Sequence, residues 1–145
     1  MQTVRGLLRG KGSQVYSISP EASVYDALKI MAEKGVGALV VLTREGELAG
    51  IVSERDYARK VEVLGKTARE TSVREIMTER VVCVRPDQTV EECMALMTNK
   101  RIRHLPVIEG NALTGIISIG DVVKAIISEQ EFMIAQLENY ITGVR

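Results

Sequence analysis

Aromatic residues are scarce in this sequence, and neither sign of charge is in excess. It has no tryptophan and one phenylalanine, and its 19 basic residues are matched by 19 acidic ones. With so few aromatic rings, base stacking is not expected as the main mode of recognition. Balanced charge also argues against a protein held to nucleic acid or to a membrane surface by bulk charge. We therefore expect no nucleic-acid or membrane partner.

Residues that usually carry catalysis or bind metals are also few. The single histidine and the two cysteines, Cys83 and Cys93, do not form any of the common zinc spacings. No glycine fingerprint for phosphates or dinucleotides follows a predicted strand. The sequence therefore predicts a protein that is not an enzyme and that has neither a metal site nor a catalytic cofactor.

Long apolar runs and a disulfide framework are absent as well. No run approaches the roughly 20 apolar residues that cross a bilayer, and the N-terminal stretch MQTVRGLLRGKG is too short and too polar for a secretory signal. Two cysteines within apolar patterns fit a reducing compartment. We expect a cytoplasmic protein in which both thiols are inert core groups, with a redox or nucleophilic role for Cys83 as the alternative.

What the chain does contain is one pattern, present twice. Residues 35–56 read GVGALVVLTREGELAGIVSERD and residues 101–121 read RIRHLPVIEGNALTGIISIGD. In each, two apolar runs flank a glycine-containing turn, and Ser-x-x-Asp then opens a helix. Pro20 and Pro86 lie 66 positions apart, and the offset falls to 65 after the hairpin. A one-residue slip in a loop is what a duplicated structure tolerates.

Each copy is expected to form a helix, a strand, a helix, two strands and a helix. In the first copy, the elements are a helix at Thr3–Leu8 broken by Gly10–Ser13, a strand at Val15–Ile18, a helix at Val24–Lys34, strands at Ala38–Leu42 and Leu48–Val52 buried on both faces, and a helix from Ser53 to about Val63. In the second copy they are a helix at Ser72–Met77, a strand at Val81–Val84, a helix at Val90–Asn99, strands at His104–Ile108 and Leu113–Ile117, and a helix after Ser118.

The chain is therefore divided into two repeats and a tail. Residues 3–63 form the first repeat, 64–71 a polar linker, 72–127 the second repeat and 128–145 a tail without a counterpart in the first half. The apolar residues of the tail have helical spacing. A terminal helix with an apolar face often docks on its own domain or on a partner subunit.

The motifs GIVSERD at 50–56, GIISIGD at 115–121 and RHLPVI at 103–108, with the helices SVYDALKIMAEKG and TVEECMALMTNK, resemble a pair of CBS domains, the regulatory module named after cystathionine β-synthase. The chain is similar to a stand-alone tandem CBS protein, or Bateman module. The resemblance implies an α/β (α+β) fold whose two repeats pack through their sheets about a pseudo-twofold axis. It also implies a homodimer with a role in signal transduction.

Many members of this family bind an adenosine-containing ligand, such as AMP, ADP, ATP or NAD, in clefts between the repeats. Asp56 and Asp121 are candidates for the ribose, because an ionised carboxylate accepts hydrogen bonds and a sugar diol offers two donors. Ser53 and Ser118 lie one turn away. The same Ser-x-x-Asp pattern is also a helix capping box, which needs no ligand, and the two interpretations are compatible.

Phosphate groups need cations or N–H donors. Arg55, Arg103, His104 and Lys11 are the candidates. The alternatives are that the arginines are solvated surface charges and that His104 is a structural residue of its strand. The sequence leaves both interpretations open.

The family's geometry implies that each cleft takes residues from both repeats. One cleft is predicted to be roomier and more neutral and to suit a dinucleotide, and the other to prefer phosphate-rich ligands. The first would contain Tyr16, Ser17, Gly37, Ala38, Ser118, Gly120 and Asp121, and the second Ser53, Arg55, Asp56, Val82, Cys83, Arg103 and His104.

Two functions thus follow from the sequence. The first is a regulatory module that binds an adenosine ligand between the repeats and signals to a regulated protein, still unidentified, by changing the geometry of the repeats or of the dimer. The alternative is a structural dimerisation or adaptor protein whose clefts are empty.

Overall fold

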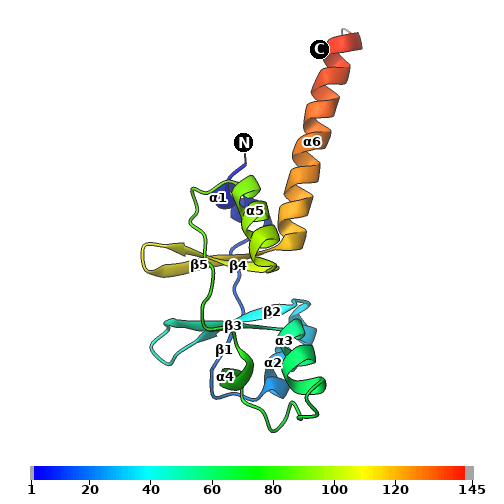
Figure 1. Cartoon of the computed structure of the whole chain (residues 1–145). Coiled ribbons are helices and arrows are strands. Elements are labelled where there is room, and N and C mark those ends of the chain that lie inside the picture. Colours follow the sequence, from blue (N-terminus) through cyan, green and yellow to red (C-terminus); the bar gives the residue numbers. More distant parts are fainter. Residues whose placement is uncertain (1, 143–145) are drawn as a thin grey trace. The chain divides into compact units, whose positions relative to one another are not determined.

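The computed structural model describes residues 2–142, which fold into two compact units (Figure 1). One unit is continuous and consists of Gln14–Val82. The other combines the start of the chain up to Ser13 with the part that begins at Cys83. We call them the continuous unit and the split unit. Both contain helices and strands, so the fold class is α+β as predicted.

The continuous unit is built on a three-stranded sheet in the order β1-β2-β3. β1 pairs with β2 in parallel, and β2 pairs with β3 antiparallel. Three helices and one π-helical turn complete the unit. Its elements are β1 (Ser17–Ile18), α2 (Val24–Lys34), β2 (Ala38–Leu42), β3 (Leu48–Ser53), α3 (Glu54–Tyr57), the π-helical turn η1 (Ala58–Glu62) and α4 (Val73–Ile76).

The split unit is built on an antiparallel hairpin. Val84 adds one parallel bridge to Val107 at the edge of β4. Three helices complete the unit. Its elements are α1 (Val4–Lys11), α5 (Val90–Lys100), β4 (His104–Glu109), β5 (Ala112–Ser118) and α6 (Ile119–Thr142).

Both hairpins form where the sequence predicts them, and they share one register. Ala38 lies opposite Ser53 in the first, and His104 lies opposite Ser118 in the second. Each ladder also shifts by a residue at the matching place, after Val41 and after Val107. The duplication seen in the sequence is therefore repeated in the backbone pairing.

Helices α2 and α5 begin at a capping hydroxyl and end at a residue in the left-handed conformation. The Ser23 and Thr89 hydroxyls accept hydrogen bonds from backbone N–H groups of the first turns of α2 and α5. α2 ends at Gly35 with φ of 65°. The matching residue after α5 is Arg101, which takes φ of 54°. A side chain in this left-handed region costs roughly 1–2 kcal/mol, so the second repeat is strained where the first is not.

Four expectations from the sequence are wrong in detail. The strand predicted at Val81–Val84 is reduced to the bridge at Val84, since the Val81 N–H donates to Glu79 O in a local turn, 3.1 Å away. The first strand, expected at Val15–Ile18, begins only at Ser17. The first helix, expected to end at Leu8, continues to Lys11, inside the expected break at Gly10–Ser13.

The fourth concerns burial in the first hairpin. β2 is buried from Ala38 to Val41, as predicted, whereas in β3 only Gly50 and Val52 are buried. The physical reason is position: β2 is the central strand of its sheet and β3 is an edge strand.

The helices of the continuous unit pack on one core. Val24, Ala27 and Met31 of α2 lie in a buried cluster that also contains Val73 and Ile76 of α4. Leu39, Val41 and Val52 contribute the side chains from the sheet. The predicted apolar stripe of the second helix is thus the face that covers the sheet.

The compact units do not coincide with the sequence repeats, because each contains the first helix of the other repeat. In the split unit, Val4 N donates to Gln88 O at 2.9 Å, and Val90 N donates to Gln2 O at 3.0 Å. The continuous unit repeats this arrangement with matching partners: Val73 N donates to Ala22 O and Val24 N to Thr71 O, both at 2.8 Å. The exchanged segments are thus held by the same pair of backbone hydrogen bonds in both units.

One glycine in each hairpin allows the exchanged segment to approach. A Cβ at Gly50 would lie 2.6 Å from the backbone oxygen of Thr78. That segment cannot retreat easily, because Thr78 and Ile51 exchange two backbone hydrogen bonds of 2.9 and 3.0 Å. A Cβ at Gly115 would lie 2.9 Å from the two terminal methyl groups of Leu8, which is a flexible side-chain end.

We therefore predict that Gly50→Ala destabilises the protein more than Gly115→Ala does. Overpacking costs typically 1–3 kcal/mol, so we expect a loss of about 3 kcal/mol for Gly50→Ala and about 1 kcal/mol for Gly115→Ala. Urea unfolding followed by circular dichroism measures both. Gly10→Ala is the control, since a Cβ there meets nothing within 4 Å and alanine favours the helix. Equal losses at Gly50 and Gly115 would contradict this account.

Candidate functional site

Each hairpin is followed by a carboxylate in the first turn of the next helix, which completes a cap with the last serine of the hairpin. Asp56 Oδ2 accepts from the backbone N–H of Ser53 at 2.9 Å and from its hydroxyl at 3.1 Å. In return, Asp56 N donates to Ser53 Oγ at 3.2 Å. Ser118 N donates to Asp121 Oδ2 at 2.8 Å, and Asp121 N donates to Ser118 Oγ at 3.2 Å. The capping interpretation is therefore confirmed at both positions.

Capping leaves hydrogen-bond acceptor sites available on both carboxylates. Each has two oxygens with about four acceptor directions, and in both residues the backbone of the capping serine uses Oδ2. The side chains are 16% exposed at Asp56 and 24% exposed at Asp121. Each carboxylate is thus held in a fixed direction while part of it still meets solvent.

A lysine lies beside each carboxylate. Lys11 Nζ lies 2.6 Å from Asp121 Oδ2 and also donates to Ile116 O at 2.9 Å. Lys60 Nζ lies 3.4 Å from Asp56 Oδ1 and donates to Ile76 O at 2.9 Å. Lys11 was expected only as a phosphate ligand, and the structure shows it paired with a candidate ribose ligand. A diol at Asp121 would therefore share the carboxylate with Lys11 or displace it.

The pKa of Asp121 lies below its ordinary value. Burial is the largest single influence and raises this pKa, but the hydrogen bonds from Lys11 and from Ser118 together outweigh it. The carboxyl group is therefore ionised near neutral pH, as an acceptor for a sugar diol has to be.

His104 lies in the same group of residues. Its pKa is lowered, chiefly by burial, with Lys11 and Arg103 adding to the effect and the Asp121 carboxylate opposing it. The ring is therefore mostly neutral at pH 7. It can offer a phosphate one hydrogen-bond donor, but it does not supply a positive charge.

In the continuous unit, residues predicted for the cleft of Asp121 lie on the strands next to the start of α3. Ala38 pairs with Ser53, and Gly37 O accepts from Glu54 N at 3.0 Å. Tyr16 immediately precedes β1, and its carbonyl oxygen accepts a hydrogen bond from the backbone N–H of Val40 in β2 at 3.3 Å. The backbone of this group is thus fixed by the sheet itself.

The predicted residues are divided between the units. Because each predicted cleft takes residues from both units, the two clefts stay predictions, whereas the serine and lysine contacts of Asp56 and of Asp121 each lie within a single unit. The continuous unit contains Tyr16, Ser17, Gly37, Ala38, Ser53, Arg55, Asp56 and Val82, and the split unit contains Cys83, Arg103, His104, Ser118, Gly120 and Asp121.

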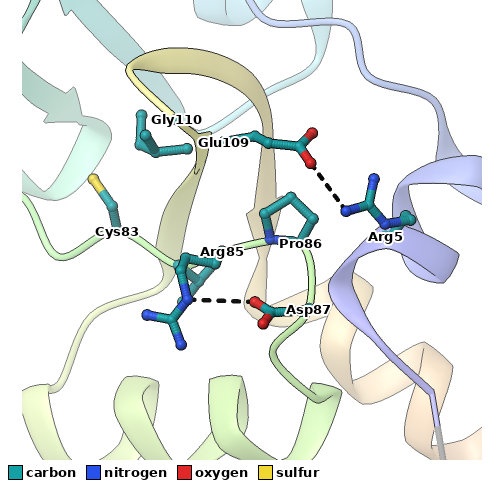
Figure 2. A pocket seen from close by; sticks show the side chains of 9 residues that line it. Arg5, Cys83, Arg85, Pro86, Asp87, Glu109 and Gly110 are labelled. Carbon is teal, nitrogen blue, oxygen red and sulfur yellow. Dashed lines mark hydrogen bonds and ion pairs between the residues drawn. The ribbon is translucent and has the colours of Figure 1, made fainter.

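The split unit also contains a pocket that sequence reasoning missed (Figure 2). Its volume is about 410 Å³, within the range of small-molecule sites. Only one of its residues, Cys83, was a candidate. The lining consists of Arg5, Cys83, Val84, Arg85, Pro86, Asp87, Ile108, Glu109 and Gly110.

The charges of this pocket are paired with one another. Arg5 contacts Glu109 at 3.0 Å, and Arg85 contacts Asp87 at 3.3 Å (Figure 2). All four side chains are about half exposed or more. Such pairs contribute little to stability and leave no uncompensated charge to attract an ion. No sequence signal links Arg5 with Glu109, because only the helix exchange brings α1 to this hairpin.

The cysteine thiols are not activated. Burial raises the pKa of Cys83, and burial together with Glu92 and Glu91 raises the pKa of Cys93 to about 11. A reactive thiol needs a lowered pKa. These environments therefore favour the inert interpretation over a redox role.

Neither a metal-binding cluster nor a membrane-spanning helix occurs among residues 2–142. No group of three or more His, Cys, Asp or Glu side chains there has a geometry that could hold a metal ion. None of the helices within this range combines the length and apolar character that a membrane span requires.

A family model described as CBS domain matches residues 12–63 and 73–128. The chain belongs to the CBS-domain family. The two matched segments contain both hairpins and both Ser-x-x-Asp motifs. Tandem CBS proteins are often regulatory or act in signal transduction, and the family model and the relatives described below indicate no catalytic family.

Three CBS relatives show how far the likeness extends. The mitochondrial CBS domain-containing protein CBSX3 of Arabidopsis thaliana is 41% identical over 97% of this chain and 72% of its own. A putative signal-transduction protein with CBS domains from Burkholderia ambifaria is 50% identical, with a TM-score of 0.85 over 89% of this chain and 96% of its own. A hexameric CBS-CP12 protein from bloom-forming cyanobacteria is 36% identical, with a TM-score of 0.76 over 85% of this chain and 70% of its own.

The contact between Lys11 and Asp121 predicts a pH-dependent contribution to stability. Because the pKa of Asp121 is lowered in the folded state, the contribution is present above its unfolded value, near 3.8, and is lost as the pH falls through the folded value. We expect Lys11→Met to lower the free energy of unfolding by about 1 kcal/mol at pH 7. The difference from the wild type should shrink below about pH 4.

Urea unfolding at pH 7, 5 and 3 measures this difference. Lys124→Met on α6 is the control, since it changes the net charge equally at an exposed position. A difference between the wild type and Lys11→Met that is as large at pH 3 as at pH 7 would show that the ion pair does not carry it.

Proposed function

We propose that this CBS protein is a regulatory module that binds an adenosine-containing ligand, namely AMP, ADP, ATP or NAD. One observation carries the proposal: the helix after each hairpin begins with a partly exposed carboxylate that its own capping serine holds in place. A diol meeting such a carboxylate does not have to order it first, so less binding free energy is lost.

The two carboxylates have different surroundings, which supports a difference in ligand preference. Each carboxylate has a lysine beside it, but Lys11 Nζ lies 2.6 Å from Asp121 whereas Lys60 Nζ lies 3.4 Å from Asp56. The sequence predicts that the cleft of Asp121 suits a dinucleotide. It predicts that the cleft of Asp56, with Arg55 and Arg103, suits phosphate-rich ligands. Both assignments belong to the proposal.

A bound ligand would signal by favouring one geometry of the repeats or of the dimer over another. A ligand shifts such an equilibrium only by its difference in affinity for the two states. A regulated protein would respond to the favoured state. We place the protein in the cytoplasm, and we propose that it self-associates as a homodimer; the hexameric cyanobacterial relative supports self-association in general.

An adaptor role is the second candidate, in which the chain dimerises and its clefts are empty. The observation that favours it is the exposure of large apolar side chains on α6, such as Phe132, Leu137 and Ile141. Exposed apolar surface of this kind often marks a protein–protein contact. The two candidates differ in whether a nucleotide stabilises the protein.

We predict that AMP, ADP, ATP or NAD at a hundredfold excess over its dissociation constant raises the free energy of unfolding by about 2.7 kcal/mol. Asp56→Ala and Asp121→Ala should each weaken binding at their own site by about 10- to 100-fold, since a hydrogen bond to a charged group contributes roughly 1.5–3 kcal/mol. Isothermal titration calorimetry with the four ligands measures the affinities.

The chain offers a matched control. Glu75 accepts from the N–H and hydroxyl of Ser72 at 2.8 and 3.1 Å, as Asp56 does from Ser53, but it follows no hairpin. Glu75→Ala should therefore lose a comparable cap and leave ligand binding unchanged. If no adenosine ligand stabilises the wild type, the adaptor role is favoured. If Glu75→Ala weakens binding as much as the aspartate variants do, the carboxylates act as caps alone.

A further inference from the structure

Helix α6 extends well beyond the rest of its unit (Figure 1). Its first turns are packed, with Val122 fully buried and Ala125 nearly so. From Gln130 to Ile141 every residue is exposed. The predicted tail helix is thus confirmed up to Thr142, while residues 143–145 lie outside the described range. Of the two alternatives given for the tail, its own domain or a partner subunit, the exposure of Gln130–Ile141 disfavours the first.

The exposed side chains of α6 form a heptad seam. Its members follow one another at alternating spacings of four and three residues, which keeps them on one side of a helix. The apolar members are all exposed, from 39% at Val123 to 80% at Ile141. We define the seam as Val123, Ile127, Gln130, Ile134, Leu137 and Ile141.

We propose that α6 pairs along this seam with α6 of a second copy of the chain, as a parallel two-stranded coiled coil. In heptad terms, three isoleucines, Ile127, Ile134 and Ile141, occupy the a positions, and Leu137 occupies a d position. Isoleucine at a with leucine at d favours two parallel strands. The inference extends the self-association part of the proposed function and requires no nucleotide.

Gln130 supports the parallel arrangement. It is the one polar residue of the seam, at a d position. In a parallel pair in register it faces the same residue of the partner, and the two amides can hydrogen-bond to each other. In an antiparallel pair it would face an apolar a position and lose that partner. A single polar seam residue specifies register in this way.

The charges of the tail favour the same arrangement. Glu131 and Glu138 occupy the e positions, while Met133 and Tyr140 occupy the g positions. In a parallel pair, e positions face g positions, so each glutamate meets an apolar flank. In an antiparallel pair, e positions face each other, and the glutamates would repel across the seam. Residues 128–142 also contain no lysine or arginine, which disfavours an anionic membrane surface as the occupant.

The seam is short, which determines the strength expected of the dimer. The seam has six residues, fewer than the roughly 20–30 residues that each partner contributes to a typical stable interface. We therefore expect a dimer whose population changes with concentration in the micromolar range. Phe132 occupies the outer f position and lies outside the seam.

Light scattering of the full chain, measured over a range of concentrations, tests the pairing. We expect a molar mass near twice the 16.0 kDa of one chain at high concentration. Ile134→Glu and Leu137→Glu should each reduce it to that of one chain. Phe132→Glu introduces the same charge on the same exposed helix and should leave the dimer intact.

Cross-linking tests the orientation. Ile127→Cys and Ile141→Cys place thiols about 21 Å apart along the helix. In a parallel pair in register, each meets its own counterpart, so each variant should form an intermolecular disulfide under mild oxidation. The wild type, with Cys83 and Cys93, is the control for background cross-linking.

Several outcomes would overturn the inference: a wild type that is monomeric at all concentrations, a dimer that survives both glutamate substitutions, loss of the dimer in Phe132→Glu, or cross-linking at fewer than both positions. These outcomes are independent of nucleotide binding. The dimer can therefore fail while an adenosine ligand still stabilises the protein, and the reverse also holds.

Discussion

The exchange of first helices between the repeats is the constraint on which each unit depends. A segment that precedes α1 is hydrogen-bonded to the segment that precedes α5, and the same arrangement joins the starts of α4 and α2. Each hairpin therefore packs against a segment that belongs to the other sequence repeat. Gly50 and Gly115 are the positions where that contact is closest. Neither repeat would have a complete core as a continuous stretch of sequence.

The same exchange assembles the surroundings of Asp121. Lys11 is 110 positions from Asp121 in the chain, yet its Nζ lies 2.6 Å from the carboxylate because α1 packs in the split unit. Arg5 reaches Glu109 for the same reason. The chemical difference between the two capping carboxylates therefore follows from the fold, since the two Ser-x-x-Asp motifs are alike in sequence. The lysine beside Asp56 comes instead from the adjoining π-helical turn η1, four residues further along the chain.

Local features of the fold were predictable and long-range ones were not. The hairpins, the caps at Ser23 and Thr89 and the capping boxes all depend on residues within a few positions of one another, and the structure confirms them. The predicted strand at Val81–Val84 failed because pairing depends on which residue meets the edge of β4, and only Val84 does. The pairing of Lys11 with Asp121 had no local signal. Tandem repetition showed that two units exist, but it could not show that they exchange helices.

Helix α6 joins the two proposals physically. Its first turn contains Asp121, and the seam follows from Val123 to Ile141, with no break in the helix between them. A rigid helix transmits a change of direction at its start to its far end. If a ligand at Asp121 shifts the start of α6, the two seams of a dimer move with it. Linkage then requires the converse: dimer formation changes the affinity for the ligand by the same factor. In the two proposals taken together, the uninterrupted helix would give a ligand signal a mechanical path to the partner chain, one that a hinge after Ile127 would remove.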